Sequence, residues 1–129
     1  MKHTPALCIV CLMLLFAASC QKNYNHYREL VYGKWELTAV DGNDPETTNT
    51  LYFKTSTSVV LHEEGIDYEG QYQFYCNKLT TYFEGKQDLF QEWLVTSLKD
   101  SLMTAVVEYY FTTAGEEEPG TVLEYKKLP

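Results

Sequence analysis

Apolar and polar residues alternate along most of the chain after residue 33, and this period of two predicts β-strands. The clearest case is Tyr68–Cys76, where Tyr68, Tyr72 and Phe74 alternate with polar residues. Short runs of turn-forming residues separate the alternating stretches. Together they predict eight strands: Trp35–Val40, Leu51–Lys54, Ser58–His62, Tyr68–Cys76, Leu79–Phe83, Phe90–Thr96, Leu102–Thr112 and Val122–Lys126.

The connections between these stretches favour one closed antiparallel sheet. Nearly all of them are short enough for hairpins, and closing a meander into a barrel removes exposed sheet edges. Helical spacing of Tyr27, Leu30 and Val31, followed by Gly33, predicts one short helix before the first strand. We therefore expect an all-β fold, an eight-stranded antiparallel up-and-down barrel with a short N-terminal helix. The alternative is an open sandwich with Greek-key crossovers, because Asp41–Asn49 is long enough for a crossover.

The first 20 residues have the pattern of a secretion signal. A basic start precedes an apolar run, Ala6–Ala18, that is too short to cross a bilayer, which takes about 20 residues. The small residues directly before Cys20 resemble the lipobox of bacterial lipoproteins, whose cysteine receives a thioether-linked lipid after cleavage. This resemblance implies a signal peptide over residues 1–19, a lipidated anchor and tether over residues 20–29, and a domain over residues 30–129. Cleavage by ordinary signal peptidase, which would leave an unanchored protein, is the alternative.

Two further features bear on where the protein would reside. Gln21, rather than Asp, follows the cysteine, which by the same resemblance implies sorting to the outer membrane. Acyl chains such as palmitate would anchor the protein there. The net charge of −8 disfavours nucleic acids and anionic lipid head groups as partners. If Cys20 carries lipid, Cys76 is the one cysteine left for the folded domain, and the sequence predicts a small buried thiol there and no internal disulfide.

Four features together resemble the lipocalins, and in particular the small lipocalin-like domains of Gram-negative bacterial lipoproteins. They are the helical lead-in, Gly33-Lys34-Trp35 at the head of the first strand, the hairpin-linked strands and the closing Leu123–Lys127. The resemblance implies that Gly33 and Trp35 close one end of the barrel under a basic side chain, Lys126 or Lys127. It also implies that Asp41–Asn49 covers the open end and that the lumen binds a small apolar molecule.

Large side chains dominate the positions expected to face the lumen. An eight-stranded barrel is just wide enough to be filled by its own side chains or to hold one small ligand. Aromatic side chains bury about 150–250 Å² each and could fill it, so a packed core and a true pocket are both open at this point. The expected lumen-facing residues are Phe53, Tyr72, Phe74, Phe83, Gln91, Trp93, Tyr109, Phe111 and Tyr125.

A second apolar surface is expected on the outer wall of the barrel. A contiguous apolar patch larger than a few hundred Å² usually marks a partner interface. Coverage of the patch by the N-terminal helix or by long charged side chains such as Lys126 is the alternative. The patch consists of residues opposite the lumen-facing set on three consecutive strands: Phe90, Leu94, Leu102, Val106, Tyr110 and Val122.

Catalytic and metal-binding motifs have little support in this chain. His62 is the one histidine beyond the lead-in, no serine or cysteine lies in a nucleophile-elbow context, and no metal-ligand spacing of His or Cys occurs. The run Glu116–Glu118 is better explained as a solvated loop than as a calcium site. We therefore expect a non-enzyme without cofactor or metal. The expected function is binding of a small hydrophobic ligand in the lumen, and the alternative is a protein-interaction or inhibitor module at the cell envelope.

Overall fold

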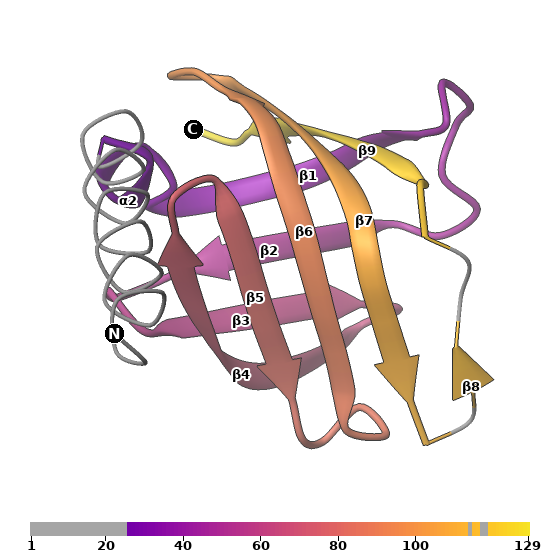
Figure 1. Cartoon of the computed structure of the whole chain (residues 1–129). Helices are drawn as coiled ribbons and strands as arrows, with labels where there is room; N and C mark the ends of the chain where they lie inside the picture. The colour runs from indigo at the N-terminus through magenta and orange to yellow at the C-terminus, as the bar shows by residue number, and fades with distance from the viewer. Residues whose placement is uncertain (1–25, 114, 117–118) are drawn as a thin grey trace, which may run out of the picture.

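The computed structural model describes residues 26–113, 115–116 and 119–129, which form a closed β-barrel preceded by one short helix (Figure 1). The barrel strands are antiparallel, and each of the first seven pairs with the next along the chain. Their bounds are α2 Tyr27–Leu30, β1 Gly33–Val40, β2 Asn49–Phe53, β3 Ser58–Glu63, β4 Ile66–Tyr75, β5 Lys78–Phe83, β6 Leu89–Leu98, β7 Leu102–Thr112, β8 Gly115–Glu116 and β9 Val122–Lys127.

Two pairings involving β9 close the sheet into a barrel. β9 pairs with β7 on one side and with β1 on the other, so no barrel strand keeps an unpaired edge along its whole length. The two-residue β8 pairs with the end of β7 alone and lies outside the ring. The expected eight-stranded up-and-down barrel with a short helix is therefore confirmed, and the open sandwich is wrong.

The helix covers one end of the barrel, which we call the closed end. Tyr27 and Val31 are buried, and the Tyr27 ring meets Phe74 edge-on with 6.3 Å between ring centroids. Arg28 Nη2 donates to the Phe74 carbonyl at 3.1 Å, which fixes the helix against β4. The helix therefore seals the end of the barrel. It does not cover the outer apolar patch, which the sequence had left as one alternative.

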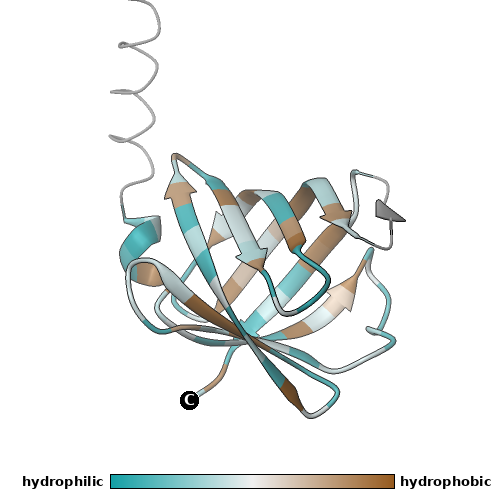
Figure 2. Ribbon diagram, turned by 90° about the horizontal axis from the view of Figure 1, so that it is seen from below, coloured by the Kyte–Doolittle hydropathy of each residue, from teal (hydrophilic) through white to brown (hydrophobic). Residues whose placement is uncertain are grey.

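The buried residues fill the inside of the ring and follow the expected alternation over most strands. Figure 2 shows apolar and polar bands alternating along the strands. On β4 and β5, for example, Tyr72, Phe74, Leu79 and Phe83 are buried while their neighbours are exposed or half-buried. The one buried polar side chain in the described part, Thr81, also faces inward.

Register shifts break the alternation on three strands, and they correct several sequence predictions. Between β6 and β7, Trp93 pairs with Val107 but Glu92 pairs with Tyr109, so Glu108 is an extra residue. Such a β-bulge shifts the inward and outward phase of every residue beyond it.

The bulge reverses the predicted facing of three aromatic residues. Tyr109 and Phe111 were expected in the lumen, but they are 43% and 39% exposed on the outer wall. Tyr110 was expected on the outer patch, but it packs against the core and pairs with lumen-facing Gln91. A similar shift between Leu37 and Ala39 turns Val40, rather than Ala39, toward the core.

Cys76 also differs from its prediction. It lies half-buried in the tight β4–β5 turn with a φ of 57°, and it is disulfide-bonded. The expected full burial is therefore wrong. The free thiol was expected for a chain without residues 1–19 and with lipid on Cys20, and it stays a prediction for that form. The signal segment 1–19, Cys20 and most of the tether lie outside the described residues, so their assignments stay predictions.

Candidate ligand cavity at the open end of the barrel

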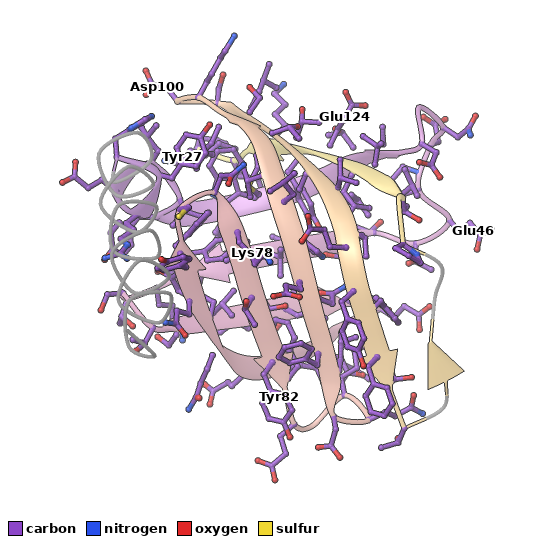
Figure 3. All side chains as sticks on the ribbon, in the orientation of Figure 1. Tyr27, Glu46, Lys78, Tyr82, Asp100 and Glu124 are labelled. Atoms are coloured by element: carbon purple, nitrogen blue, oxygen red, sulfur yellow. The ribbon has the colours of Figure 1, made fainter. Side chains whose placement is uncertain are left out.

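A cavity of about 530 Å³ occupies the half of the lumen farthest from the helix. The β1–β2 loop forms part of its wall through Asp41, Asn43, Asp44, Pro45, Glu46 and Thr47. Figure 3 shows Glu46 and Tyr27 at opposite ends of the barrel. The loop expected from the lipocalin resemblance to cover the open end thus lies at the cavity. Pockets of this size accommodate small organic ligands.

The inner wall of the cavity is apolar and contains two stacked aromatic rings. Trp93 of β6 and Tyr125 of β9 are both buried, and their ring centroids lie 5.6 Å apart at an interplanar angle of 29°. Aliphatic side chains from six strands, β1, β2, β3, β6, β7 and β9, complete this wall: Leu37, Val40, Leu51, Leu61, Leu89, Val107 and Leu123. This wall offers a flat apolar surface to a ligand.

A polar cluster lines another part of the cavity. Lys86 Nζ forms an ion pair with Glu63 Oε1 at 2.5 Å, and Asn49 Nδ2 donates to the other carboxylate oxygen of Glu63 at 3.1 Å. Lys86 Nζ also lies 5.5 Å from the centroid of the Tyr68 ring. Lys86 is thus the single basic residue among those that line the cavity, and its charge is already matched by Glu63.

Two residues that line the cavity each have a buried polar atom without a hydrogen-bond partner. In the part of the chain that the structure describes, the buried side-chain atoms without a partner are Asn49 Oδ1 and Trp93 Nε1. Both side chains line this cavity. Buried polar groups are nearly always hydrogen-bonded in folded proteins, so their coincidence in one cavity indicates a place where a bound molecule completes the hydrogen bonding.

Tyr125 and Gln91 add neutral polar groups to the same wall. Burial first, and then the negative charge of Glu63, raises the pKa of the Tyr125 hydroxyl well above its usual range, so this group stays protonated. Thr81 Oγ1 donates to Gln91 Oε1 at 3.3 Å, which orients the Gln91 carboxamide beside the buried strand β5. The cavity therefore combines an aromatic wall with several hydrogen-bonding groups.

Four of the expected lumen residues do not line this cavity, and three of them, Phe53, Tyr72 and Phe74, pack in the closed half of the barrel. Phe53 and Tyr72 meet edge-on at 4.9 Å between ring centroids, and Phe74 contacts the helix. Tyr72 donates its hydroxyl hydrogen to the Thr55 carbonyl at 2.5 Å, and burial raises its pKa to about 12. Phe83 is fully buried. The lumen is thus packed at one end and hollow at the other, and of the nine expected residues Gln91, Trp93 and Tyr125 line the hollow.

Trp35 lies at the closed end, and of the two lysines that the lipocalin resemblance offered, Lys127 lies over its rings. Trp35 is fully buried and its Nε1 donates to the Val31 carbonyl at 2.8 Å. Lys127 Nζ lies 5.5 Å from the centroid of the Trp35 rings, a cation–π contact, whereas Lys126 is exposed. Lys126 is therefore not the capping residue. It follows Tyr125 on β9, and the alternation of the strand turns it outward.

Gly33 is required where the Lys127 side chain crosses β1. A Cβ at residue 33 would lie 2.8 Å from Lys127 Cε, and the backbone has a φ of 116°. A side chain at residue 33 would displace the end of the Lys127 side chain, and the positive φ would strain any residue other than glycine. The Gly-x-Trp triplet thus has a local physical explanation in this barrel.

The outer wall carries two apolar groups separated by charge. Tyr82, Phe90 and Phe111 form a cross-strand row on β5, β6 and β7, and Phe90 meets Tyr109 edge-on at 5.8 Å between ring centroids. Tyr82 projects from the barrel near the β5–β6 turn in Figure 3. We call Tyr82, Phe90, Tyr109 and Phe111 the outer aromatic cluster.

The expected single outer patch is therefore divided. Lys78 Nζ lies 3.6 Å from Glu92 Oε1 and 3.5 Å from Glu108 Oε2, and these charges separate the outer aromatic cluster from a row of aliphatic residues. That row consists of Leu94, Val106 and Val122, which are cross-strand neighbours. Leu102, at the start of β7, is 55% exposed and pairs with Lys126.

Sequence reasoning missed the polar cluster and Tyr110. Glu63 and Lys86 carry no signal in the linear pattern, because nothing in it shows that the end of β3 and the β5–β6 turn lie close together. Tyr110 was assigned to the wrong face because both phases of Tyr109-Tyr110-Phe111 are apolar. The one available signal was the polar residue Asn49 at the start of an otherwise apolar strand.

The described residues contain no group of three or more His, Cys, Asp or Glu side chains that could hold a metal ion. Within the same residues, no helix is long and apolar enough to cross a membrane. Comparisons with protein-family models, curated proteins and solved structures gave no significant match.

Proposed function

We propose that this protein is an outer-membrane lipoprotein, anchored through Cys20, whose lipocalin-like barrel binds a small and largely apolar molecule. The observation that carries the proposal is the cavity of about 530 Å³ with the stacked Trp93 and Tyr125 on its wall. A flat apolar ligand that displaced water from this wall would gain the hydrophobic free energy of both surfaces. The N-terminal pattern around Cys20 supports the anchor.

Two neighbouring tyrosines on β7 test binding in the lumen. Tyr110 lines the cavity, whereas Tyr109 lies on the outer wall, so Tyr110→Ala and Tyr109→Ala remove the same side chain from opposite faces. We expect Tyr110→Ala to weaken binding of the neutral fluorescent probe N-phenylnaphthylamine by about 5- to 30-fold, since loss of a buried aromatic contact costs roughly 1–2 kcal/mol. Tyr109→Ala should change the affinity less than about twofold. Equal effects of the two substitutions, or absence of probe binding to the parent protein, would contradict the proposal.

The outer aromatic cluster supports a second candidate function, a protein-interaction or inhibitor module. Tyr82, Tyr109 and Phe111 are between 39% and 43% exposed, and such aromatic residues are enriched in protein interfaces. Native mass spectrometry of the mature protein, extracted gently from its own envelope, distinguishes the candidates. A bound small molecule would favour the lumen, and a bound second protein would favour the outer wall.

The mass of the extracted protein also shows whether Cys20 carries lipid. A thioether-linked lipid on Cys20 adds mass and excludes a disulfide between Cys20 and Cys76, because the sulfur of Cys20 is then used. An unmodified mass would contradict the lipoprotein assignment and leave the cavity proposal untouched.

A further inference from the structure

We propose that the cavity selects a neutral aromatic compound that carries a hydrogen-bond acceptor such as a carbonyl, and that it rejects the corresponding carboxylate. This inference depends on the proposed function, because it names the chemical class of ligand for the same cavity. It is built on the buried Trp93 indole, on the distribution of charge around the cavity and on the aromatic wall.

The Trp93 indole N–H is the donor that a ligand would satisfy. Trp93 is 2% exposed and lines the cavity, and its Nε1 has no acceptor among the described residues. An indole nitrogen donates and never accepts, so the group that completes this site must be an acceptor. The other tryptophan of the chain, Trp35, already donates to the Val31 carbonyl.

The charges around the cavity oppose an anionic ligand. Asp41, Asp44, Glu46 and Glu63 line the cavity or its mouth, and Lys86 is the single basic residue among the lining side chains. Because Lys86 is held by Glu63 at 2.5 Å, a ligand carboxylate would have to break this ion pair or remain beside uncompensated carboxylates. A neutral acceptor satisfies Trp93 without either cost.

The aromatic wall sets the shape of the ligand. The stacked Trp93 and Tyr125 rings present an extended flat surface, on which a planar ring system packs with more contact than a flexible chain of equal volume. Tyr125 stays protonated, so the wall itself adds no negative charge. Asn49 Oδ1, the second atom without a partner, would accept from a donor on the ligand or from a trapped water.

Three probes with one shared ring system test the proposal on the full mature protein. Acetylnaphthalene, ethylnaphthalene and naphthoate, substituted at the same ring position, differ in the presence of an acceptor and in charge. Calorimetric titration should give acetylnaphthalene at least a tenfold tighter binding than ethylnaphthalene and than naphthoate. Naphthoate binding should strengthen as salt screens the acidic mouth, whereas acetylnaphthalene binding should not change.

The tryptophan signals give a direct readout of the hydrogen bond. The chain has two tryptophans, so its proton–nitrogen NMR spectrum has two indole N–H signals, and Trp93→Phe identifies the Trp93 signal by its loss. Acetylnaphthalene should shift the Trp93 signal downfield and leave the Trp35 signal in place, which also reports that the closed end is folded. In Trp93→Phe, the preference for acetylnaphthalene over ethylnaphthalene should fall below twofold.

The outcomes separate this inference from the proposed function. If all three probes bind the parent with equal affinity, or if the preference persists in Trp93→Phe, the inference is wrong while binding in the lumen stands. If naphthoate binds most tightly, the electrostatic argument is wrong. If none of the probes binds and neither indole signal moves, both the inference and the proposed function fail.

Discussion

At the scale of single residues, the closed end shows how three residues determine one another. Trp35 is held by the Val31 carbonyl, Lys127 lies over its rings, and Gly33 leaves room for the Lys127 side chain to cross. Lysine lacks the planar guanidinium of arginine, so it contributes here as a point charge over the indole. The seal is therefore formed by local contacts, and these contacts select Lys127 from the two lysines that the lipocalin resemblance offered.

Lys127→Met tests the seal at this scale. Methionine keeps much of the apolar length but removes the charge, so we expect a loss of about 0.5–1 kcal/mol in the free energy of unfolding, measured by chemical denaturation. Lys126→Met is the matched control on the exposed face of the same strand and should change stability by less than about 0.5 kcal/mol. A larger loss for Lys126→Met than for Lys127→Met would show that the assignment of the capping lysine is wrong.

At the scale of elements, the bulges decide which side chains reach the cavity. The shift on β1 turns Val40 inward, and the extra residue Glu108 on β7 accompanies the inward placement of Tyr110. Bulges are frequent at barrel rims, where they redirect a side chain while the ladder continues. In this barrel both redirected side chains line the cavity wall.

Deletion of Glu108 tests the interpretation of the bulge. Without this residue, Val107 and Tyr109 become adjacent, and the ladder to β6 becomes regular without changing which way Tyr109 and Tyr110 face. We expect the shortened protein to fold with a loss of only about 1 kcal/mol, from the exposed Lys78 ion pair, measured by thermal unfolding.

A deletion in a regular strand is the control. Removing Thr80 from β5, which has no register shift with either neighbour, would turn one half of that strand inside out. This variant should not fold. If the two deletions are equally damaging, Glu108 is not a tolerated extra residue.

The same elements show how much of this structure the sequence could predict. The number and order of the barrel strands, and the long loop between β1 and β2, follow from alternation and turn residues, which are local properties. The prediction of which side chains point inward fails beyond each bulge, because the extra residue shifts the in–out alternation by one position. The sequence does not reveal this shift, because Tyr109-Tyr110-Phe111 has apolar residues at both alternating positions.

Of the candidate site, Trp93, Gln91 and Tyr125 could be predicted because the extra residues of the bulges beside them lie on β7 and β1, so β6 and β9 keep their own alternation there. The Glu63–Lys86 pair could not be predicted, because it joins the end of β3 to the β5–β6 turn, which are distant in the sequence and meet only in the folded barrel.

At the scale of the whole molecule, the two ends of the barrel differ: one end is packed and the other is hollow. The helix, Trp35 and the Phe53–Tyr72 pair fill one end, and the cavity opens at the other beside the β1–β2 loop (Figure 1). The chain enters the barrel at the packed end. A lipid on Cys20 would therefore hold the packed end toward the bilayer and direct the cavity mouth away from it.

This orientation gives a prediction for the membrane-bound protein. The tether of residues 20–25 spans at most about 22 Å, whereas the longest strand, with 11 residues, is about 36 Å long. A fluorescent amino acid at residue 32, beside the helix, should therefore be quenched more strongly by nitroxide-labelled lipids than the same amino acid at residue 46, in the β1–β2 loop. Cys20→Ser should abolish quenching at both residues and release the protein from the membrane. Stronger quenching at residue 46 would place the cavity mouth against the bilayer, where ligand exchange would occur with lipid and not with the aqueous phase.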